Sequence, residues 1–258
     1  MQFFSHDGFD FAFVDQQPPA AESAEPILLI HGFASSHIAN WVAPGWVKTL
    51  TEAGYRPIAF DNRGHGASSK SYDPADYYPG KMAGDAAALL AHLGIEQAHV
   101  FGYSMGARIA AFLALAEPQL VASLIFGGLG IGMVDGVGHW DLIAEALVVA
   151  DPAETTDKRA RMFRTFADQT KSDRKALAAC IATSRELLSE ADVSRIAQPT
   201  LIAIGTKDDI GGSAEALAAL MPNAVAFAVE GRDHMLSVGD RTFKKRAIEF
   251  LKDHPIRA

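Results

Sequence analysis

The sequence has almost no cysteine, since Cys180 is the only one among 258 residues. A single thiol cannot form a disulfide within the chain, so the cysteine usage gives no sign of an oxidising compartment. Cys180 lies in an alanine-rich stretch with helical periodicity. We interpret it as a small buried apolar residue and not as a reactive thiol.

The sequence also lacks long apolar runs and an excess of basic residues. No apolar stretch approaches the ~18 residues that a membrane-spanning helix requires. Residues 1–13 have no basic region, and we interpret them as two strands that turn at Asp7 and Gly8, not as a signal peptide. The formal net charge of −8 disfavours nucleic acids and anionic membranes as partners. We therefore expect a small-molecule substrate and a cytoplasmic location.

Short apolar runs alternate with helical patterns along most of the chain. Continuous apolar runs that end at glycine or aspartate are typical of strands buried on both faces. Helical stripes occupy residues 84–93 and 105–116. The alternation predicts an α/β fold with a mostly parallel, doubly wound sheet, in which ligands bind beyond the carboxyl ends of the strands. The predicted strands are 26–30, 57–60, 99–102, 123–126, 200–204 and 224–229.

The alternation of strands and helices stops between residues 130 and 195, where the density of charged residues rises. Strand-like runs are absent from this part of the sequence. We interpret residues 131–190 as a helical cap inserted into a core that consists of residues 1–130 and 191–258. The helical patterns of the cap cover residues 140–149, 157–167 and 174–188.

The segment 102–106 has the sequence GYSMG, which fits the pattern G-x-S-x-G, and lies directly between a predicted strand and a predicted helix. A serine at such a turn has strained backbone and is exposed at the helix N-terminus, where free N–H groups favour negative charge. Gly102 and Gly106 allow the strand and the helix to approach closely. Two flanking glycines disfavour the alternative in which Ser104 merely caps the helix. The pattern predicts Ser104 as a nucleophile.

A second segment, His31-Gly32-Phe33, closes the first long apolar run and predicts an oxyanion hole. A glycine here allows a sharp turn, so that the N–H group of Phe33 faces the site together with that of Met105. We interpret His31 as a structural residue packed under this loop. Two tryptophans downstream either line the pocket or pack in the core, namely Trp41 and Trp46.

Nine histidines are candidates for the general base. His234 follows the last apolar run directly, which places it on a loop at the carboxyl edge of the sheet. His65 precedes the serine in the chain and fits a turn. His92 lies in a predicted helix and His139 in the predicted cap, where a solvated or structural role is more common. The sequence therefore predicts His234 as the base.

The acid that orients this histidine is predicted to be Asp208. It follows the strand 201–204 and so lies at the same carboxyl edge of the sheet. Asp209 is the alternative, but its carboxylate is better placed to cap the turn. Asp233 is adjacent to His234 in the chain, and backbone geometry disfavours an orienting hydrogen bond between such neighbours.

These residues predict acyl transfer through a covalent intermediate. His234 removes the proton of Ser104 as the hydroxyl attacks a carbonyl, and Asp208 stabilises the imidazolium that forms. The N–H groups of Phe33 and Met105 bind the oxyanion. His234 then protonates the leaving group, and water completes the reaction.

Five segments together resemble the α/β-hydrolase superfamily over nearly the whole length of the chain. The resemblance implies an eight-stranded sheet with a helical cap, neither a metal nor an organic cofactor, and the triad order Ser104, Asp208, His234. The five segments are 31–33 (HGF), 61–68 (DNRGHGAS), 102–106 (GYSMG), 199–208 (PTLIAIGTKD) and 231–234 (GRDH).

The resemblance leaves more than one reaction open. A serine at position 104, in place of an aspartate, argues against haloalkane dehalogenases and epoxide hydrolases. Carboxylesterases, lactonases, haloperoxidase-like perhydrolases and carbon–carbon bond hydrolases remain. We expect a hydrolase that cleaves a carboxylic ester, or a lactone, of a small to medium apolar substrate. A carbon–carbon bond hydrolase acting on a diketone or ring-cleavage product is the alternative, and Arg185 and Trp140 are residue types that such enzymes carry in or near the cap. A ligand-binding protein without catalysis is a further alternative.

Overall fold

The computed structural model describes residues 1–19, 24–136, 138 and 140–256. Its strands form one eight-stranded sheet in the order β1-β2-β4-β3-β5-β6-β7-β8. The strands from β3 to β8 are parallel, whereas β1 and β2 pair antiparallel at one edge. The strands are β1 (Gln2–His6), β2 (Phe9–Asp15), β3 (Pro26–Ile30), β4 (Arg56–Phe60), β5 (Ala98–Tyr103), β6 (Val121–Gly127), β7 (Thr200–Gly205) and β8 (Ala224–Val229).

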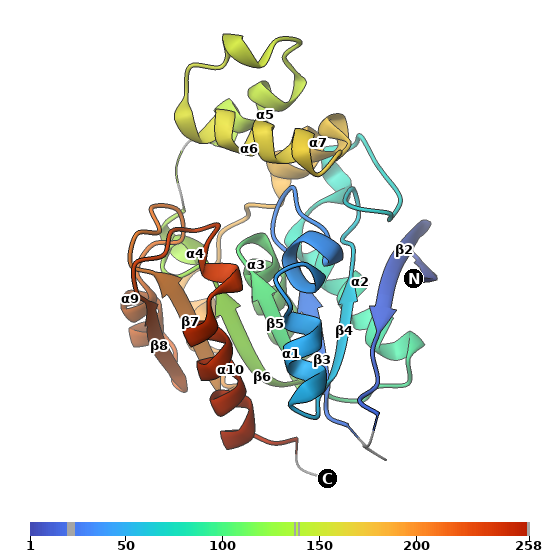
Figure 1. Cartoon of the computed structure of the whole chain (residues 1–258), viewed down its shortest axis with the longest axis vertical. Helices are drawn as coiled ribbons and strands as arrows, with labels where there is room; N and C mark the ends of the chain where they lie inside the picture. Colours follow the sequence, from blue (N-terminus) through green and yellow to red (C-terminus); the bar gives the residue numbers. More distant parts are fainter. Residues whose placement is uncertain (20–23, 137, 139, 257–258) are drawn as a thin grey trace.

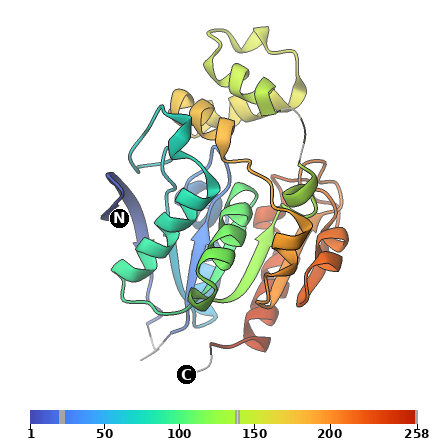
Figure 2. The same ribbon diagram turned by 180° about the vertical axis from the view of Figure 1, so that it is seen from behind.

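Helices cover both faces of the sheet (Figure 1, Figure 2). Helices α1 (Trp46–Glu52) and α10 (Arg241–Asp253) lie on one face, where apolar side chains of both helices pack on the strands. The opposite face carries α2 (Pro79–His92), α3 (Met105–Ala116) and α9 (Ala214–Leu220). The remaining helices are α4 (Gly132–Asp135), α5 (Trp140–Val148), α6 (Lys158–Gln169), α7 (Arg174–Thr183) and α8 (Glu190–Ser194).

The predicted fold class is confirmed, and all six predicted core strands are present. The N-terminal strand pair is also confirmed, because β1 and β2 form a hairpin that turns at Asp7 and Gly8. Both turn residues have positive φ angles, 50° and 78°, which is the conformation that a tight two-residue hairpin turn requires. The aspartate–glycine pair therefore accounts for the start of the fold.

Strand β8 and helix α2 differ from what the sequence predicted. The strand β8 is not buried on both faces, because it forms an edge of the sheet and most of its side chains are partly or fully exposed. Helix α2 begins at Pro79, five residues before the predicted start at residue 84. Proline is favoured in the first turn of a helix, since its missing N–H is not needed there. The apolar stripe alone did not reveal this earlier start.

The segment between β6 and β7 places α5, α6 and α7 beyond the carboxyl ends of the strands (Figure 1). The expected helix 174–188 is too long, since α7 ends at Thr183. The residues that follow are held by tertiary hydrogen bonds: the N–H of Leu188 donates to Met133, and the carbonyl of Glu186 accepts from the Arg108 side chain. These contacts replace the helical bonds of the last turn. The boundaries 131–190 for a cap stay a prediction, and His139 lies outside the described residues.

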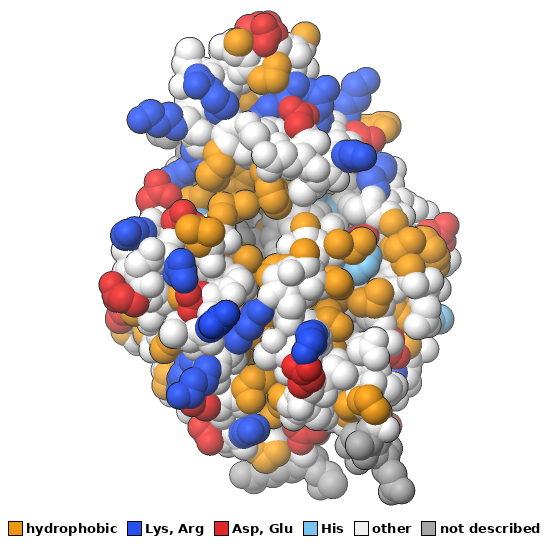
Figure 3. Space-filling model, viewed as in Figure 1, with side chains coloured by type: hydrophobic (Ala, Val, Ile, Leu, Met, Phe, Trp, Pro, Cys, Tyr) orange, Lys and Arg blue, Asp and Glu red, His pale blue; other side chains and the backbone are white. Residues whose placement is uncertain are grey.

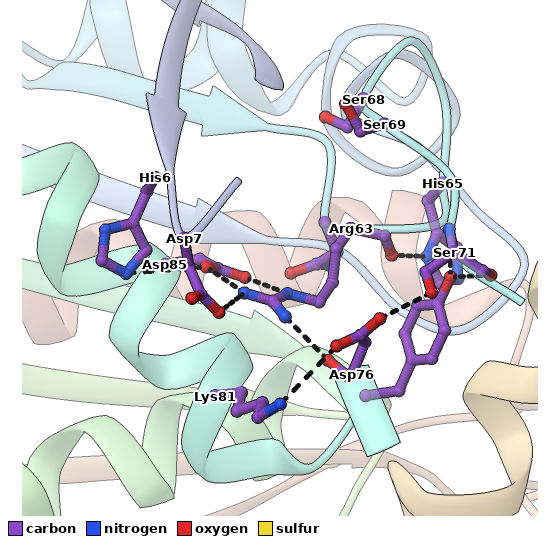
Figure 4. Close-up of polar contacts among 12 residues, drawn as sticks. His6, Asp7, Arg63, His65, Ser68, Ser69, Ser71, Asp76, Lys81 and Asp85 are labelled. Carbon is purple, nitrogen blue, oxygen red and sulfur yellow. Dashed lines mark hydrogen bonds and ion pairs between the residues drawn. The ribbon is translucent and has the colours of Figure 1, made fainter. Parts of the chain in front are cut away.

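A buried ion pair ties the N-terminal hairpin to the loop after β4. Arg63 is fully buried and donates two hydrogen bonds of 2.7 Å to the carboxylate of Asp85 on α2. It also donates to the carbonyl of Asp76 and lies 3.4 Å from the carboxylate of Asp7 in the hairpin turn (Figure 4). The arginine of the segment 61–68 thus has a structural role in this protein.

The tryptophans that the sequence left undecided pack in the core. Trp41 and Trp46 are fully buried and make edge contacts with Phe101, at 4.6 and 4.7 Å between ring centroids. Neither lines the cavity next to Ser104. Among the described residues, no helix has both the length and the hydropathy needed to span a membrane.

Candidate active site

Ser104 lies at the junction of strand β5 and helix α3, on a backbone with φ of 53° and ψ of −113°. A non-glycine residue rarely adopts a positive φ, so the surrounding structure must compensate for local strain. The N–H of Ser104 donates to the carbonyl of Gly127 on β6 at 2.7 Å. This bond and the start of α3 hold the serine in its turn.

The two glycines of this turn occupy positions where no side chain fits. A Cβ atom on Gly102 would lie 2.1 Å from the carbonyl oxygen of Gly106, and one on Gly106 would lie 1.9 Å from that of Ile30. Backbone atoms cannot move away as a flexible side chain can. The close packing of α3 on β3 and β5 therefore requires glycine at both positions.

His234 lies between Ser104 and Asp208. Its Nε2 atom is 3.1 Å from Oγ of Ser104, and its Nδ1 atom is 2.8 Å from Oδ2 of Asp208. An ionised carboxylate can only accept hydrogen bonds, so Nδ1 carries the proton and Nε2 presents a lone pair to the serine hydroxyl. The structure thus brings together the nucleophile, base and acid that the sequence predicted.

The backbone around His234 is also held in place. The hydroxyl of Tyr103, the residue before Ser104, donates to the carbonyl oxygen of His234 at 2.6 Å. Tyr103 is buried, and burial raises the pKa of its hydroxyl, so this donor keeps its proton. The tyrosine therefore links the loop of the histidine to the strand of the serine.

Asp208 binds more than the histidine. Its other oxygen, Oδ1, accepts from the backbone N–H groups of Ile210 and Gly211 at 2.8 and 3.0 Å. Burial alone would raise the pKa of this carboxyl. The hydrogen bond and charge of His234, together with the two N–H groups, hold the pKa below its usual value. Asp208 is therefore ionised at neutral pH.

Asp209 does not cap the turn, in contrast to the expectation. Its side chain is 85% exposed and lies 3.7 Å from the guanidinium of Arg159, while Asp208 itself caps the turn. Asp233 accepts from the N–H groups of Met235 and Leu236, whereas the ring of His234 is hydrogen-bonded to Asp208 and Ser104. Of the two adjacent aspartates, Asp208 and Asp209, it is Asp208 that is hydrogen-bonded to His234.

Phe33 and Met105, the residues predicted to form an oxyanion hole, line a cavity together with Ser104. Met105 is the first residue of α3, so its N–H precedes the first internal hydrogen bond of the helix. Phe33 follows Gly32, whose position is fixed by a hydrogen bond from its N–H to the side chain of Asn40 at 3.0 Å. No acceptor within the described part of the chain takes the N–H of Phe33. The oxyanion hole of Phe33 and Met105 stays a prediction.

Two other histidines lie close to the site but are buried. His31 donates to the carbonyl of Gly32 and accepts from the N–H of Asn62, and burial lowers its pKa to about 4. Burial also lowers the pKa of His65 to about 3. Both are neutral and packed below the loop that contains Phe33. Cys180 is likewise buried, which raises the pKa of its thiol to about 12.

An apolar cavity of about 140 Å³ opens next to Ser104 and His234. Phe163 and Phe166 of α6 form its upper wall, and Met235 and Val238 lie beside the histidine. Hydrophobic side chains gather around a hollow below these helices (Figure 3). Apolar walls of this kind suit a small hydrophobic ligand group.

A second, narrower cavity of about 30 Å³ meets Ser104 from the side of α3. Trp140 and Arg185, which the sequence singled out, both line it. Arg108 lines it as well, and sequence reasoning missed this residue. Arg108 lies one helical turn after Ser104 on α3, so its spacing from the nucleophile was the available signal.

Among the described residues, no group of three or more histidine, cysteine, aspartate or glutamate side chains is arranged to hold a metal ion. The described surroundings of Ser104 are His234 with Asp208 behind it, the mostly apolar wall of the first cavity, and the wall of the second cavity with Arg108 and Arg185.

The doubly wound sheet, the strained serine turn and the hydrogen-bonded histidine and aspartate define a class of protein with a nucleophile elbow. Residues 25–154 match the family model described as alpha/beta hydrolase fold. The chain belongs to this family.

The curated relatives match only part of the chain. "Putative non-heme bromoperoxidase BpoC" of Mycobacterium tuberculosis is 34% identical over 163 residues, which are 62% of this chain and 60% of the relative. "Epoxide hydrolase B" of the same organism is 34% identical over 125 residues, 45% of this chain and 32% of the relative. A solved structure of a hydrolase from Pseudomonas aeruginosa PA01 is similar over 97% of both chains, with a TM-score of 0.81 and 24% identity.

Proposed function

We propose that the protein hydrolyses carboxylic esters, including lactones, through an acyl-enzyme on Ser104. The observation that carries this proposal is the hydrogen-bonded chain from Asp208 through His234 to the hydroxyl of Ser104, next to an apolar cavity. The related sequences include an epoxide hydrolase, but the resemblance implies an aspartate nucleophile in such enzymes. The serine at position 104 favours ester chemistry.

The proposed mechanism uses only groups of this chain and water. Oγ of Ser104 attacks the ester carbonyl while Nε2 of His234 takes its proton, and Asp208 stabilises the resulting imidazolium. The N–H groups of Phe33 and Met105 bind the oxyanion, and each such donor typically contributes about 10²–10³ in turnover. His234 then protonates the leaving alcohol. Water attacks the acyl-enzyme with the same proton transfers in turn, which releases the acid.

The first test is a chain-length series of p-nitrophenyl esters with the wild-type protein, Ser104→Ala and His234→Ala. We expect turnover that peaks at one acyl length, and a loss of roughly 10⁴–10⁶ in kcat for each variant. The loss follows because the nucleophile, or the base that activates it, is absent. Near-normal turnover in both variants would contradict the triad.

A fluorophosphonate probe separates two reasons for low turnover. Labelling of Ser104 with negligible hydrolysis of every ester would indicate a competent nucleophile behind a selective pocket, and lactones and diketones would then be assayed. Labelling without turnover on any of these compounds would favour a ligand-binding protein on the same fold.

A second candidate function is the hydrolysis of a carbon–carbon bond in a diketone or ring-cleavage product. The observation that favours it is the position of Arg185 and Trp140 in the wall of a cavity that also contacts Ser104. An arginine there can bind a carboxylate of such a substrate. Faster turnover on a ring-cleavage product than on any ester, with the same dependence on Ser104, would support this function over ester hydrolysis.

A further inference from the structure

Ser104 and Phe33 each line both cavities, so the nucleophile lies at the junction of two spaces with different walls. Among the described residues, the wall of the first cavity, next to His234, contains no aspartate, glutamate, lysine or arginine. The wall of the second cavity, above α3, contains two arginines and, within the described part of the chain, no acidic residue. A substrate bound across Ser104 therefore places one half in each environment.

The position of His234 indicates which cavity binds the leaving group and which binds the acyl half of the substrate. The histidine must protonate the leaving alcohol, so the leaving group lies on its side of the serine, in the apolar cavity. The acyl chain extends the other way from the carbonyl carbon, past Met105 and toward Arg108. The acyl half of the substrate thus faces the two arginines. This assignment rests on the proposed ester hydrolysis.

The two arginines differ in how they are held. Arg108 is 4% exposed and donates to the carbonyl oxygens of Gly132, Met133 and Glu186, but no carboxylate binds it within the described part of the chain. Burial lowers the pKa of Arg108 to about 10, which leaves it charged at neutral pH. Glu186 attracts this cation without a hydrogen bond between the two side chains, so the attraction offsets only part of the cost of burial. An anion bound directly to Arg108 would offset more of that cost.

Arg185 lies at the outer end of the same space. Its side chain is 33% exposed and donates to the carboxylate of Asp141, which is itself 83% exposed. Arg108, Trp140 and Arg185 also line the adjoining opening to the surface, and its wall includes the carboxylate of Asp135. The guanidinium of Arg185 can therefore turn toward an anion that enters along the cavity, because its present partner is a solvated surface carboxylate.

We propose that the acyl half of the substrate is an unbranched chain that ends in a carboxylate, bound between Arg108 and Arg185. The small volume of this cavity, about 30 Å³, favours an unbranched chain over a ring. The substrate class is then the monoester of a short dicarboxylic acid with an apolar alcohol. Ser104 attacks the ester carbonyl, the alcohol leaves with a proton from His234, and water releases the dicarboxylic acid.

Three phenyl esters of equal acyl length test this assignment. Monophenyl glutarate carries the charge on the acyl half, phenyl pentanoate carries none, and 4-carboxyphenyl pentanoate carries it on the leaving group. We expect kcat/KM of the wild-type protein to be about tenfold or more higher for monophenyl glutarate than for the other two, since charge-assisted hydrogen bonds are the strong ones. Ser104→Ala supplies the background rate of each ester.

Variants of the outer arginine locate the binding site. Arg185→Met should lower the ratio of kcat/KM for monophenyl glutarate to kcat/KM for phenyl pentanoate about tenfold, mainly through the KM of monophenyl glutarate. Arg185→Lys should restore part of the preference. Asp141→Asn removes the carboxylate that competes with the substrate for Arg185, and should increase the preference for monophenyl glutarate. Arg108 is left unchanged in these variants because it donates hydrogen bonds to three backbone carbonyls, so its replacement would also disturb the fold.

The outcomes separate this inference from the proposed function. Ser104-dependent hydrolysis of phenyl pentanoate without a preference for monophenyl glutarate would overturn the inference alone. The same holds for a preference that Arg185→Met leaves unchanged, or for a preference for 4-carboxyphenyl pentanoate. No Ser104-dependent hydrolysis of any of the three esters would overturn both.

Discussion

At the scale of single residues, the site depends on a proton that Asp208 fixes on one nitrogen of His234. Oδ2 of this aspartate accepts from Nδ1, and Oδ1 accepts from two backbone N–H groups. The two backbone N–H groups thus orient the carboxylate. Because the carboxylate keeps the proton on Nδ1, the lone pair of the ring is on Nε2, facing Ser104. The side chain of the neighbouring Asp209 is 85% exposed and lies 3.7 Å from the guanidinium of Arg159.

This difference predicts opposite outcomes for two adjacent substitutions. In Asp208→Asn the amide oxygen can keep the backbone bonds, but the NH₂ group then faces Nδ1 and favours the wrong tautomer of His234. We expect kcat to fall by about 10³–10⁴. The kcat of Asp209→Asn should stay within about twofold of that of the wild-type protein. Ester hydrolysis at saturating substrate measures both, and equal effects of the two substitutions would contradict the assignment of Asp208.

Residue types and their positions along the chain were sufficient to predict Ser104, Asp208 and His234. Each lies just after a recognisable strand, and the carboxyl ends of parallel strands meet at one edge. Arg108 could not be predicted in the same way. Its position in the cavity wall depends on the end of α7 and on the segment 184–188, which tertiary hydrogen bonds define.

At the scale of elements, helices α2 and α3 contain glycines with opposite consequences. Gly84 lies in the middle of α2 with a negative φ, and a Cβ there would meet nothing closer than 4.0 Å. Gly106 lies in the first turn of α3, where a Cβ would overlap the carbonyl oxygen of Ile30. One glycine is replaceable, whereas the other allows the helix to pack on β3.

The same substitution at these two positions should therefore change stability in opposite directions. Gly84→Ala should raise the free energy of unfolding by about 0.5–1 kcal/mol, because alanine loses less backbone entropy on folding. Gly106→Ala should lower it by about 3 kcal/mol or more, because the backbone must shift. Urea denaturation monitored by circular dichroism measures both. A loss of stability in Gly84→Ala would show that α2 tolerates no added side chain there.

Element boundaries were less predictable from the sequence than element types. The strand runs are apolar throughout and need no partner to be recognised, whereas the end of α7 depends on where Arg108 and Met133 bind the following residues. The exposure of β8 was also hard to predict, because an apolar run does not show whether a further strand lies beside it in the sheet. Long-range contacts determine both features.

At the scale of the whole molecule, buried neutral histidines make the stability depend on pH. His31 and His65 are fully buried between the first loop of the site and the segment 61–68. Burial is the largest cause of their low pKa values, about 4 and about 3, and it outweighs the attraction of Asp61. In the unfolded chain a histidine has a pKa of ~6.5.

The sign of the effect follows from proton binding. Below about pH 6.5 the unfolded chain binds protons at these histidines that the folded chain does not bind, until the pH reaches the folded values of about 4 and about 3. Full stability is therefore present above pH 6.5 and is lost as the pH falls through this window. Each histidine contributes at most ~1.4 kcal/mol per pH unit.

We expect His31→Gln and His65→Gln to reduce this dependence, whatever their effect at pH 7. The free energy of unfolding is measured by urea denaturation at pH 7.0, 6.0 and 5.0 for the wild-type protein, each variant and the double variant. The difference between pH 7 and pH 5 should be smaller in each single variant by about 1–2 kcal/mol, and smallest in the double variant. Comparison among these proteins cancels the contribution of the carboxylates that titrate in the same range, since all four proteins share them.

Parallel pH dependences in all four proteins would mean that His31 and His65 accept protons without unfolding. The loop that carries Phe33 would then be able to accommodate charge beneath it, and the loss of stability in acid would have to arise from carboxylates such as Asp208, whose pKa is lowered on folding.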